Sequence, residues 1–280
     1  MAYEYDHLGV EVAGRLATVT IDNPPINLIT RDLFRELVNL SETLQADREL
    51  SVVVVRSANP DFFIAHFDVE SILSFPGGPD AAEAQKSFEV NPFHAMCERF
   101  RTMDKVTIAQ IEGRVGGGGS ELAASMDMRF GVRGKTKINQ MEVPIGILPG
   151  GTGTQRLPRL MGRGRAMEVI LGGDDLDAET AERWGYLNRI FEADQIGPFV
   201  DKLARRIAGF PVESVRLGKQ AVNEYEQPLA QGLANESYLF QRLLRTENSQ
   251  KFMKAFLEKG GQTHDGEMRV GELNGELADD

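Results

Sequence analysis

The sequence has 280 residues, 41% of them hydrophobic and 26% charged, which is the balance of a folded globular protein with a sizeable core. Its formal net charge of −11 disfavours a nucleic-acid partner, because binding a duplex requires a basic surface. Cys97 is the only cysteine, which excludes an internal disulfide and a thiolate metal cluster. The sequence carries no secretory signal pattern and no apolar run of membrane-spanning length, so we expect a cytoplasmic protein without membrane contact.

The first third of the chain predicts a hairpin, a helix and a buried strand. Residues 9–22 alternate between apolar and polar side chains around a glycine turn, as a hairpin does. Thr30 then precedes a helical repeat of leucines over residues 31–47 and is a suitable N-terminal residue for that helix. The β-branched run at 51–57 predicts a strand buried on both faces. Residues 58–73 are expected to form a loop that leads into a short helix.

The middle of the chain alternates between helix and strand patterns. We expect a helix over 83–103, a strand over 105–113, a helix that starts at 120–125 and a strand over 126–132. This alternation is typical of an α/β protein with a layered core.

The remainder predicts a loop and then mainly helices. Residues 141–162 form a long loop with a second glycine cluster, followed by a helix. Two short helices and a strand should follow at 164–173, 177–185 and 187–192, with Asp177 as an N-cap and Gly185 as a stop. From Ile196 onward the pattern is mostly helical. The polar, acidic and glycine-rich stretch 260–280 is expected to be extended or partly disordered.

The sequence lacks the motifs of common nucleotide-binding, hydrolase and metal sites. The glycine spacing after Gly116 or Gly151 does not match a dinucleotide fingerprint, and a phosphate loop ending at Thr136 lacks its first glycine. Ser120 lacks the second glycine of a nucleophile elbow. The four histidines have no metal-ligand spacing, so we expect no metal site.

Four consecutive glycines, residues 116–119, lie between a predicted strand and a predicted helix. Residues without side chains let a substrate approach the backbone, and N–H groups at a helix N-terminus favour negative charge. Such donors can form an oxyanion hole, and Glu121 would then project into the same pocket. The alternative is a tight strand-to-helix crossing with a surface-facing glutamate. A second acid, Glu142, lies beside the second glycine cluster, and two carboxylates in one pocket make a general acid/base pair.

Several segments resemble the enoyl-CoA hydratase/isomerase (crotonase) superfamily. The resemblance rests on "IEGRVGGGGSELAASMDMRF", "MEVPIGILPGGTGTQRLPRLMGRGRAMEVILGG" and "DAETAERWGYLNRIF", together with "NPPINLIT" and "FFIAHFDVESI". It extends from about residue 10 to residue 225 and is weaker beyond. The implied fold is α/β and crotonase-like, with repeated β-β-α units in a spiral core. That core, with the active site, would span 1–210, and a C-terminal helical oligomerisation region with an acidic, flexible tail would span 211–280.

The resemblance also implies roles for individual residues. The backbone N–H groups of Phe67 and Gly118 would form the oxyanion hole, Glu121 would help activate a water molecule, and Glu142 would exchange the proton at C2. The coenzyme A chain and acyl group would contact Pro25, Ile26, Leu28, Ala65, His66, Asp68, Val69, Gly117 and Gly150. His66 stands where the family has a glycine, so it is either strained by a positive φ or adds a polar group at the pocket mouth.

The function implied is hydration of a 2-enoyl-CoA thioester through an enolate, with coenzyme A as part of the substrate and no separate cofactor. Double-bond isomerisation, another reaction of the family on an acyl-CoA, and a catalytically weak acyl-CoA-binding protein are the alternatives. The resemblance implies a homotrimer or hexamer. Trp184, Phe240 and Phe256 are expected to be core or subunit contacts rather than ligand contacts.

Overall fold

The computed structural model describes residues 3–78, 80–209, 212–223, 240–241 and 244–278. Its strands form two mixed sheets, one of six strands in the order β1-β2-β3-β5-β7-β10 and one of four in the order β4-β6-β8-β9. The strands are β1 (Leu8–Ala13), β2 (Leu16–Ile21), β3 (Val52–Ser57), β4 (Phe62–Ile64), β5 (Val106–Ile111), β6 (Arg114–Gly116), β7 (Met128–Val132), β8 (Lys137–Asn139), β9 (Leu176–Asp177) and β10 (Arg189–Phe191).

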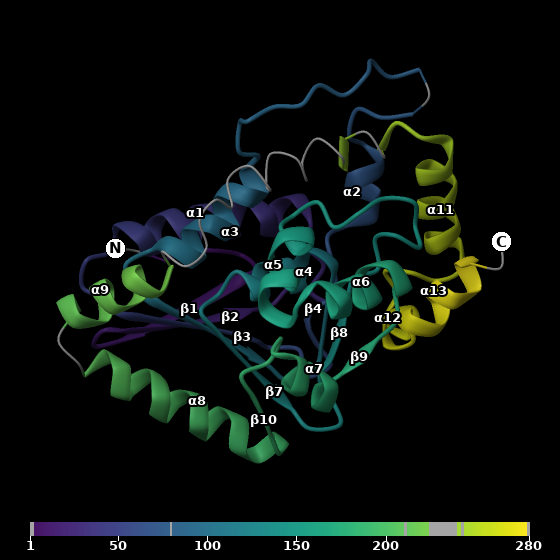
Figure 1. Ribbon diagram of the computed structural model, residues 1–280. Coiled ribbons are helices and arrows are strands. Elements are labelled where there is room, and N and C mark those ends of the chain that lie inside the picture. Colours follow the sequence, from purple (N-terminus) through teal and green to yellow (C-terminus); the bar gives the residue numbers. More distant parts are fainter. Residues whose placement is uncertain (1–2, 79, 210–211, 224–239, 242–243, 279–280) are drawn as a thin grey trace.

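Helices cover the sheets and form the C-terminal part (Figure 1). They are α1 (Arg31–Ala46), α2 (Val69–Leu73), α3 (Pro92–Thr102), α4 (Gly117–Ala124), α5 (Gly153–Met161), α6 (Arg163–Gly172), α7 (Ala178–Trp184), α8 (Ala193–Ala208), α9 (Val212–Asn223), α11 (Glu247–Glu258), α12 (His264–Met268) and α13 (Val270–Ala278). None of the described helices is both long and apolar enough to cross a membrane.

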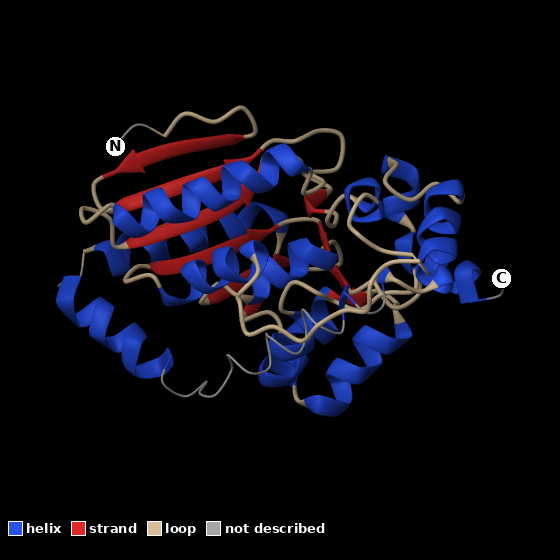
Figure 2. Cartoon of the chain, turned by 90° about the horizontal axis from the view of Figure 1, so that it is seen from above, coloured by secondary structure: helices blue, strands red, loops and turns tan. Residues whose placement is uncertain are grey.

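The large sheet is parallel except for the β1–β2 hairpin, which pairs antiparallel as the alternating pattern predicts. Helices α1 and α3 lie along one face and α8 lies on the other (Figures 1 and 2). The first four residues of β3, Val52 to Val55, are at most 4% exposed, as expected for a strand covered on both faces. Alternate side chains of the strands therefore pack into two separate apolar clusters, one under α1 and α3 and one under α8.

Local signals at helix ends are confirmed. The Thr30 side chain accepts a hydrogen bond from the Leu33 amide at the start of α1, and Asp177 accepts one from the Thr180 amide at the start of α7. Gly185 ends α7 with a φ of 91°, a conformation that glycine adopts readily.

The C-terminal stretch corrects one prediction. Residues 260–278 do not form an extended tail, because α12 and α13 make most of this stretch helical. Val270, Leu273 and Leu277 of α13 are at most 3% exposed and pack with α11 and with residues of the core. The segment is polar overall, but its apolar residues recur at helical spacing and form a stripe that packs against the rest of the protein.

Other boundaries also differ from the sequence pattern. The helix predicted over 83–103 covers only Pro92–Thr102, because Asn91 caps it and Pro92 occupies its first position. The loop expected over 58–73 contains β4, and α4 begins at Gly117, within the glycine run rather than after it. The mainly helical pattern expected from Ile196 onward also covers residues 210–211 and 224–239, including Pro211 and Pro228, and these residues lie outside the described ones.

Candidate active site

The glycine run packs directly against the segment that follows β4. A Cβ atom at Gly116 would lie 2.5 Å from the Ala65 carbonyl oxygen, and one at Gly119 would lie 2.6 Å from the Ile64 Cβ. Both distances are too short for real Cβ atoms, so these two positions require glycine for packing within the chain. The sequence analysis missed this reason, because it depends on two segments that are 50 residues apart.

Gly117 places two further residues next to each other. It has a φ of +45°, and its Cβ atom would lie 2.9 Å from the His66 Cβ and 3.0 Å from the Glu142 Oε1. Gly117 therefore lies between His66 and the Glu142 carboxylate, and it has no side chain to keep them apart.

Two backbone N–H groups lie at the junction of these segments. A Cβ atom at Gly118 would lie 3.3 Å from the Phe67 Cβ, so these two residues lie side by side.

The Phe67 N–H points toward α4. On the other edge of the extended segment, Ile29 donates to the His66 carbonyl and accepts from the Asp68 amide. Successive amides of an extended strand alternate in direction, so the Phe67 amide faces away from Ile29. Gly118 is the second residue of α4, where amides have no acceptor within the helix. The Gly118 amide, in the first turn of α4, therefore lies beside the segment that carries the Phe67 amide.

Glu121 is 3% exposed, which contradicts the surface-facing alternative. One oxygen of its carboxylate, Oε1, accepts hydrogen bonds from the amides of Gly151, Thr152 and Gly153 at 2.9, 2.9 and 2.8 Å. These amides open α5, so Glu121 caps a helix that begins about 30 residues later. The second glycine cluster is needed for this approach, because a Cβ atom at Gly151 would lie 2.3 Å from the Glu121 Oε2.

Glu142 is 6% exposed and lies at the start of a turn after β8. Its Oε2 accepts a hydrogen bond from the Gln140 side-chain amide at 3.1 Å. Glu121 and Glu142 line the same cavity, so the structure brings together the two acids that the sequence singled out.

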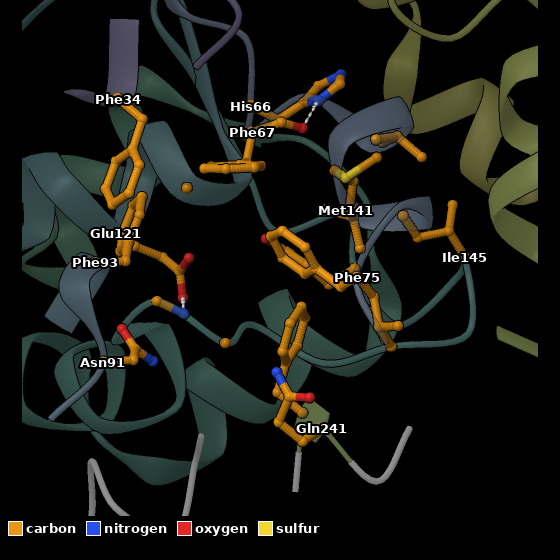
Figure 3. Close-up of a pocket in the computed structure, with 18 of the residues that line it drawn as sticks. Phe34, His66, Phe67, Phe75, Asn91, Phe93, Glu121, Met141, Ile145 and Gln241 are labelled. Carbon is orange, nitrogen blue, oxygen red and sulfur yellow. Dashed lines mark hydrogen bonds between the residues drawn. The ribbon is translucent and has the colours of Figure 1, made fainter. Parts of the chain in front are cut away.

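The cavity has a volume of about 430 Å³ and is mainly apolar. In Figure 3 the Glu121 carboxylate lies at one end beside Phe34 and Phe93, while Met141 and Ile145 line the other end. Phe67 and Phe75 project between the two ends (Figure 3). The remaining lining residues named by the sequence analysis are His66, Val69, Gly118 and Gly150.

Other residues expected to contact a ligand lie outside this cavity. Ile26 and Ala65 are buried and pack with Phe62, with Leu28 at the edge of that cluster. Pro25 is exposed, and Asp68 caps α2 by accepting from the Ser71 amide. Gly117 touches the site through Glu142, as described above, without lining the cavity.

Several phenylalanine side chains that line the cavity were not predicted from the sequence. Phe34, Phe75, Phe93 and Phe240 line the cavity, although Phe240 was expected to be a core or subunit contact. Phe34 stacks on Phe93 with ring centroids 5.8 Å apart, and Phe67 meets both rings edge-on. These residues come from separate elements, and no pattern in the sequence connects them. Phe256 is fully buried, as expected of a core residue.

His66 is not strained. Among the described residues other than glycine, only Asn27 and Gln262 have a positive φ. The imidazole instead contacts Glu267, with Nε2 and Oε1 2.7 Å apart and both side chains almost fully buried. Within the described residues, no group of three or more His, Cys, Asp or Glu side chains is arranged to hold a metal ion.

Known proteins are similar to this chain over nearly its whole length. The family described as Enoyl-CoA hydratase/isomerase matches residues 11–267. A protein named probable enoyl-CoA hydratase from Mycobacterium leprae is 31% identical over 258 residues, covering 91% of this chain and 96% of that protein. A crotonyl-CoA hydratase from Syntrophomonas wolfei is 30% identical over 260 residues, with the same two coverages. A crystal structure from Streptomyces avermitilis superposes with a TM-score of 0.88 at 33% identity, over 99% of this chain and 100% of that one.

Proposed function

The chain belongs to the enoyl-CoA hydratase/isomerase (crotonase) superfamily, and on that basis we propose that it adds water across the double bond of a 2-enoyl-CoA thioester. The observation that supports the proposal is one cavity lined by Phe67, Gly118 and two buried acids, Glu121 and Glu142. In this proposal the backbone amides of Phe67 and Gly118 are the donors.

The thioester oxygen would accept hydrogen bonds from the Phe67 and Gly118 amides. As water attacks C3, the electron pair of the C2–C3 double bond moves through C1 onto this oxygen and forms an enolate. Fixed donors stabilise the negative charge of the enolate oxygen more strongly than they stabilise the neutral carbonyl. Removing one such donor typically slows turnover about 10²–10³-fold.

Glu121 and Glu142 would hold and activate the water from the same side of the acyl group. Glu121 accepts a hydrogen bond from the water and orients its attack on C3. The proton that the water loses reaches C2 through Glu142, so the hydroxyl group and the proton are both added and each carboxylate returns to its starting state. The presence of both acids in one cavity favours hydration over isomerisation, which needs a single proton shuttle.

The acyl group would be bulky and apolar. The cavity of about 430 Å³ is lined mainly by aromatic and aliphatic side chains, and they extend away from Glu121 toward Met141 and Ile145. Burying apolar area contributes roughly 25 cal/mol per Å², so a four-carbon acyl group would leave much of the available binding free energy unused.

The homotrimer or hexamer implied by the family resemblance, and the cytoplasmic location, stay predictions. Sedimentation of the purified full chain would distinguish a monomer from these assemblies.

The proposed activity is tested by following the loss of the enoyl-thioester absorbance with crotonyl-CoA and with longer 2-enoyl-CoA thioesters. Glu142→Gln keeps the hydrogen-bonding shape but cannot exchange the proton, so kcat should fall about 10²-fold or more. Asp127→Asn, in a partly buried ion pair with Lys219 outside the cavity, is the matched control and should retain turnover. Unchanged turnover in Glu142→Gln would contradict the assigned role.

A further inference from the structure

A buried ion pair joins the Phe67 segment to the C-terminal helices. His66 immediately precedes Phe67, and Glu267 lies in α12, 201 residues later in the chain. Their exposed fractions are 1% and 2%, and the Nε2 to Oε1 distance is 2.7 Å. Neither the proposed reaction nor the packing of the large sheet requires this pair.

Both nitrogens of the His66 ring face hydrogen-bond acceptors. Nε2 faces the Glu267 carboxylate, and Nδ1 lies 2.8 Å from the Phe67 carbonyl oxygen (Figure 3). A neutral imidazole carries one N–H and would direct a lone pair at one of these acceptors, whereas an imidazolium donates to both. The geometry therefore matches a charged His66 paired with a charged Glu267.

The charges around the pair agree with that assignment. Burial lowers the pKa of His66, but the Glu267 charge and hydrogen bond, the Phe67 carbonyl and the Asp68 charge outweigh it, and the pKa is raised above 6.5. Burial raises the pKa of Glu267, but His66, the Gln262 amide and the charge of Arg114 on β6 together lower it below 4.5. The Glu142 carboxylate lies across Gly117 from His66.

The main chain is held on both sides of the Phe67 Cα, and the His66 ring contributes on one side. The peptide that contains the Phe67 N–H is held by the bond from the Ile29 amide to the His66 carbonyl, at 2.9 Å. The following peptide is held by the bond from the Asp68 amide to the Ile29 carbonyl, at 3.1 Å, and by the bond from His66 Nδ1 to the Phe67 carbonyl. With both peptide planes held, the Phe67 N–H can point in only one direction, which is what a preorganised donor needs.

The C-terminal helices complete this support. The Gln262 amide donates to the same Glu267 oxygen at 2.7 Å, and the Gln262 side chain donates to Asp68 Oδ1 at 2.5 Å. The His66 ring also meets Phe256 of α11 edge-on, with centroids 5.6 Å apart. Loosening these helices would therefore release the segment that carries Phe67.

We propose that His66, held as an imidazolium by Glu267, is a positioning residue that aims the Phe67 N–H at the thioester oxygen and makes turnover depend on the docking of α12. The inference rests on the proposed hydratase function. It assigns the residue in place of the family glycine a task that glycine cannot perform, because glycine has no side chain to bind the Phe67 carbonyl.

Three variants separate the two contacts of the ring. His66→Asn retains a donor near the Nδ1 position, His66→Gln retains one near the Nε2 position, and Glu267→Gln keeps the shape of the partner without its charge. Each should lower kcat by about 10-fold or more, less than the loss of a whole donor, while KM for the enoyl-CoA changes by less than about 3-fold. Asp127→Asn is the control, because it removes the carboxylate charge from the partly buried pair with Lys219, which lies outside the cavity.

The pH profile provides a readout that a purely structural role would not change. Because the pKa of His66 is raised in the folded protein, the imidazolium is present below pH 6.5 and is lost as the pH rises through the folded pKa. The kcat of the wild-type protein should therefore fall on that alkaline side. Glu267→Gln lowers the pKa of His66, so the fall in kcat should begin at a lower pH. His66→Gln has no imidazole to titrate, so this fall in kcat should be absent.

Nitrogen NMR of the ¹⁵N-histidine-labelled full chain measures the charge directly and keeps the inference testable if a His66 variant fails to fold. The His66 ring should be doubly protonated at pH 6 in the wild-type protein, and in Glu267→Gln it should lose its second proton at lower pH than in the wild-type protein. A neutral wild-type ring, or a pH profile unchanged by Glu267→Gln, would overturn the inference. A wild-type protein that hydrates no enoyl-CoA would refute the proposed function instead. Loss of activity in Glu142→Gln with full activity in all three variants would refute only the role of His66.

Discussion

Gly118 and Phe67 approach so closely that a Cβ atom on Gly118 would lie 3.3 Å from the Cβ of Phe67. Gly118 comes from the first turn of α4 and Phe67 from the segment after β4, so the contact joins two segments that are distant in the sequence. This contact has a direct consequence for substitutions at the glycine.

Gly118→Ala should slow turnover without unfolding the protein. Its backbone does not have a positive φ, so alanine fits the conformation, but the new methyl group presses on Phe67 and Phe93 and shifts the donors. We expect kcat to fall about 10-fold or more, measured with the enoyl-CoA assay. Gly164→Ala on α6, where no atom lies within 4 Å of the added Cβ, should keep kcat and add up to about 1 kcal/mol of stability. Equal kcat in both variants would contradict a donor at Gly118.

Glu121 and Glu142 should differ in what they contribute to stability. Glu121→Ala removes the acceptor of three backbone amides and should lower the free energy of unfolding by about 2–4 kcal/mol, since unsatisfied buried donors are costly. Glu142→Ala should cost about 1 kcal/mol, because it removes an acceptor of the Gln140 side-chain amide rather than the acceptor of three backbone amides that open a helix. Both variants should lose turnover. Urea unfolding measures the difference, and a larger loss of stability in Glu142→Ala would show that the capping role is misassigned.

Phe75 should limit the size of the acyl group. Its ring projects into the cavity and tilts against Phe67 at a centroid distance of 6.4 Å. Phe75→Ala should raise kcat/KM for the longest accepted 2-enoyl-CoA relative to crotonyl-CoA by about 10-fold, within the range that one apolar contact contributes. Phe88→Ala, at a residue that is 69% exposed, is the matched control. A chain-length profile that is the same in all three proteins would place the acyl group elsewhere.

Leu273 should be essential to the C-terminal helices. It is fully buried among α11, α13 and core residues, so Leu273→Ala should lower the free energy of unfolding by about 2–5 kcal/mol. Met268→Ala, at a residue that is 44% exposed, should change it by less than about 0.5 kcal/mol. Thermal or denaturant unfolding provides the test. If the two variants are equally stable, the stretch after residue 260 does not pack as described.

Much of the first half of the fold could be predicted from local patterns. The leucine repeat after Thr30, the β-branched strand at Val52 and the alternating hairpin each report the periodicity of one element, and each was confirmed. The strands β6, β8 and β9 were missed because two or three residues are too few to show a period. The C-terminal helices were missed because their apolar stripe is diluted by acids and glycines.

By itself, the sequence determined the α/β alternation, the unusual glycine run and the pair of acids, since each is a property of neighbouring residues. Only the tertiary structure decided that Glu121 caps α5 and that His66 pairs with Glu267. It also decided that rings from four elements enclose one cavity. The physical reason is that hydrogen bonds and close packing depend on distances in space. Partners that lie 30 or 201 residues apart along the chain leave no periodic trace in it.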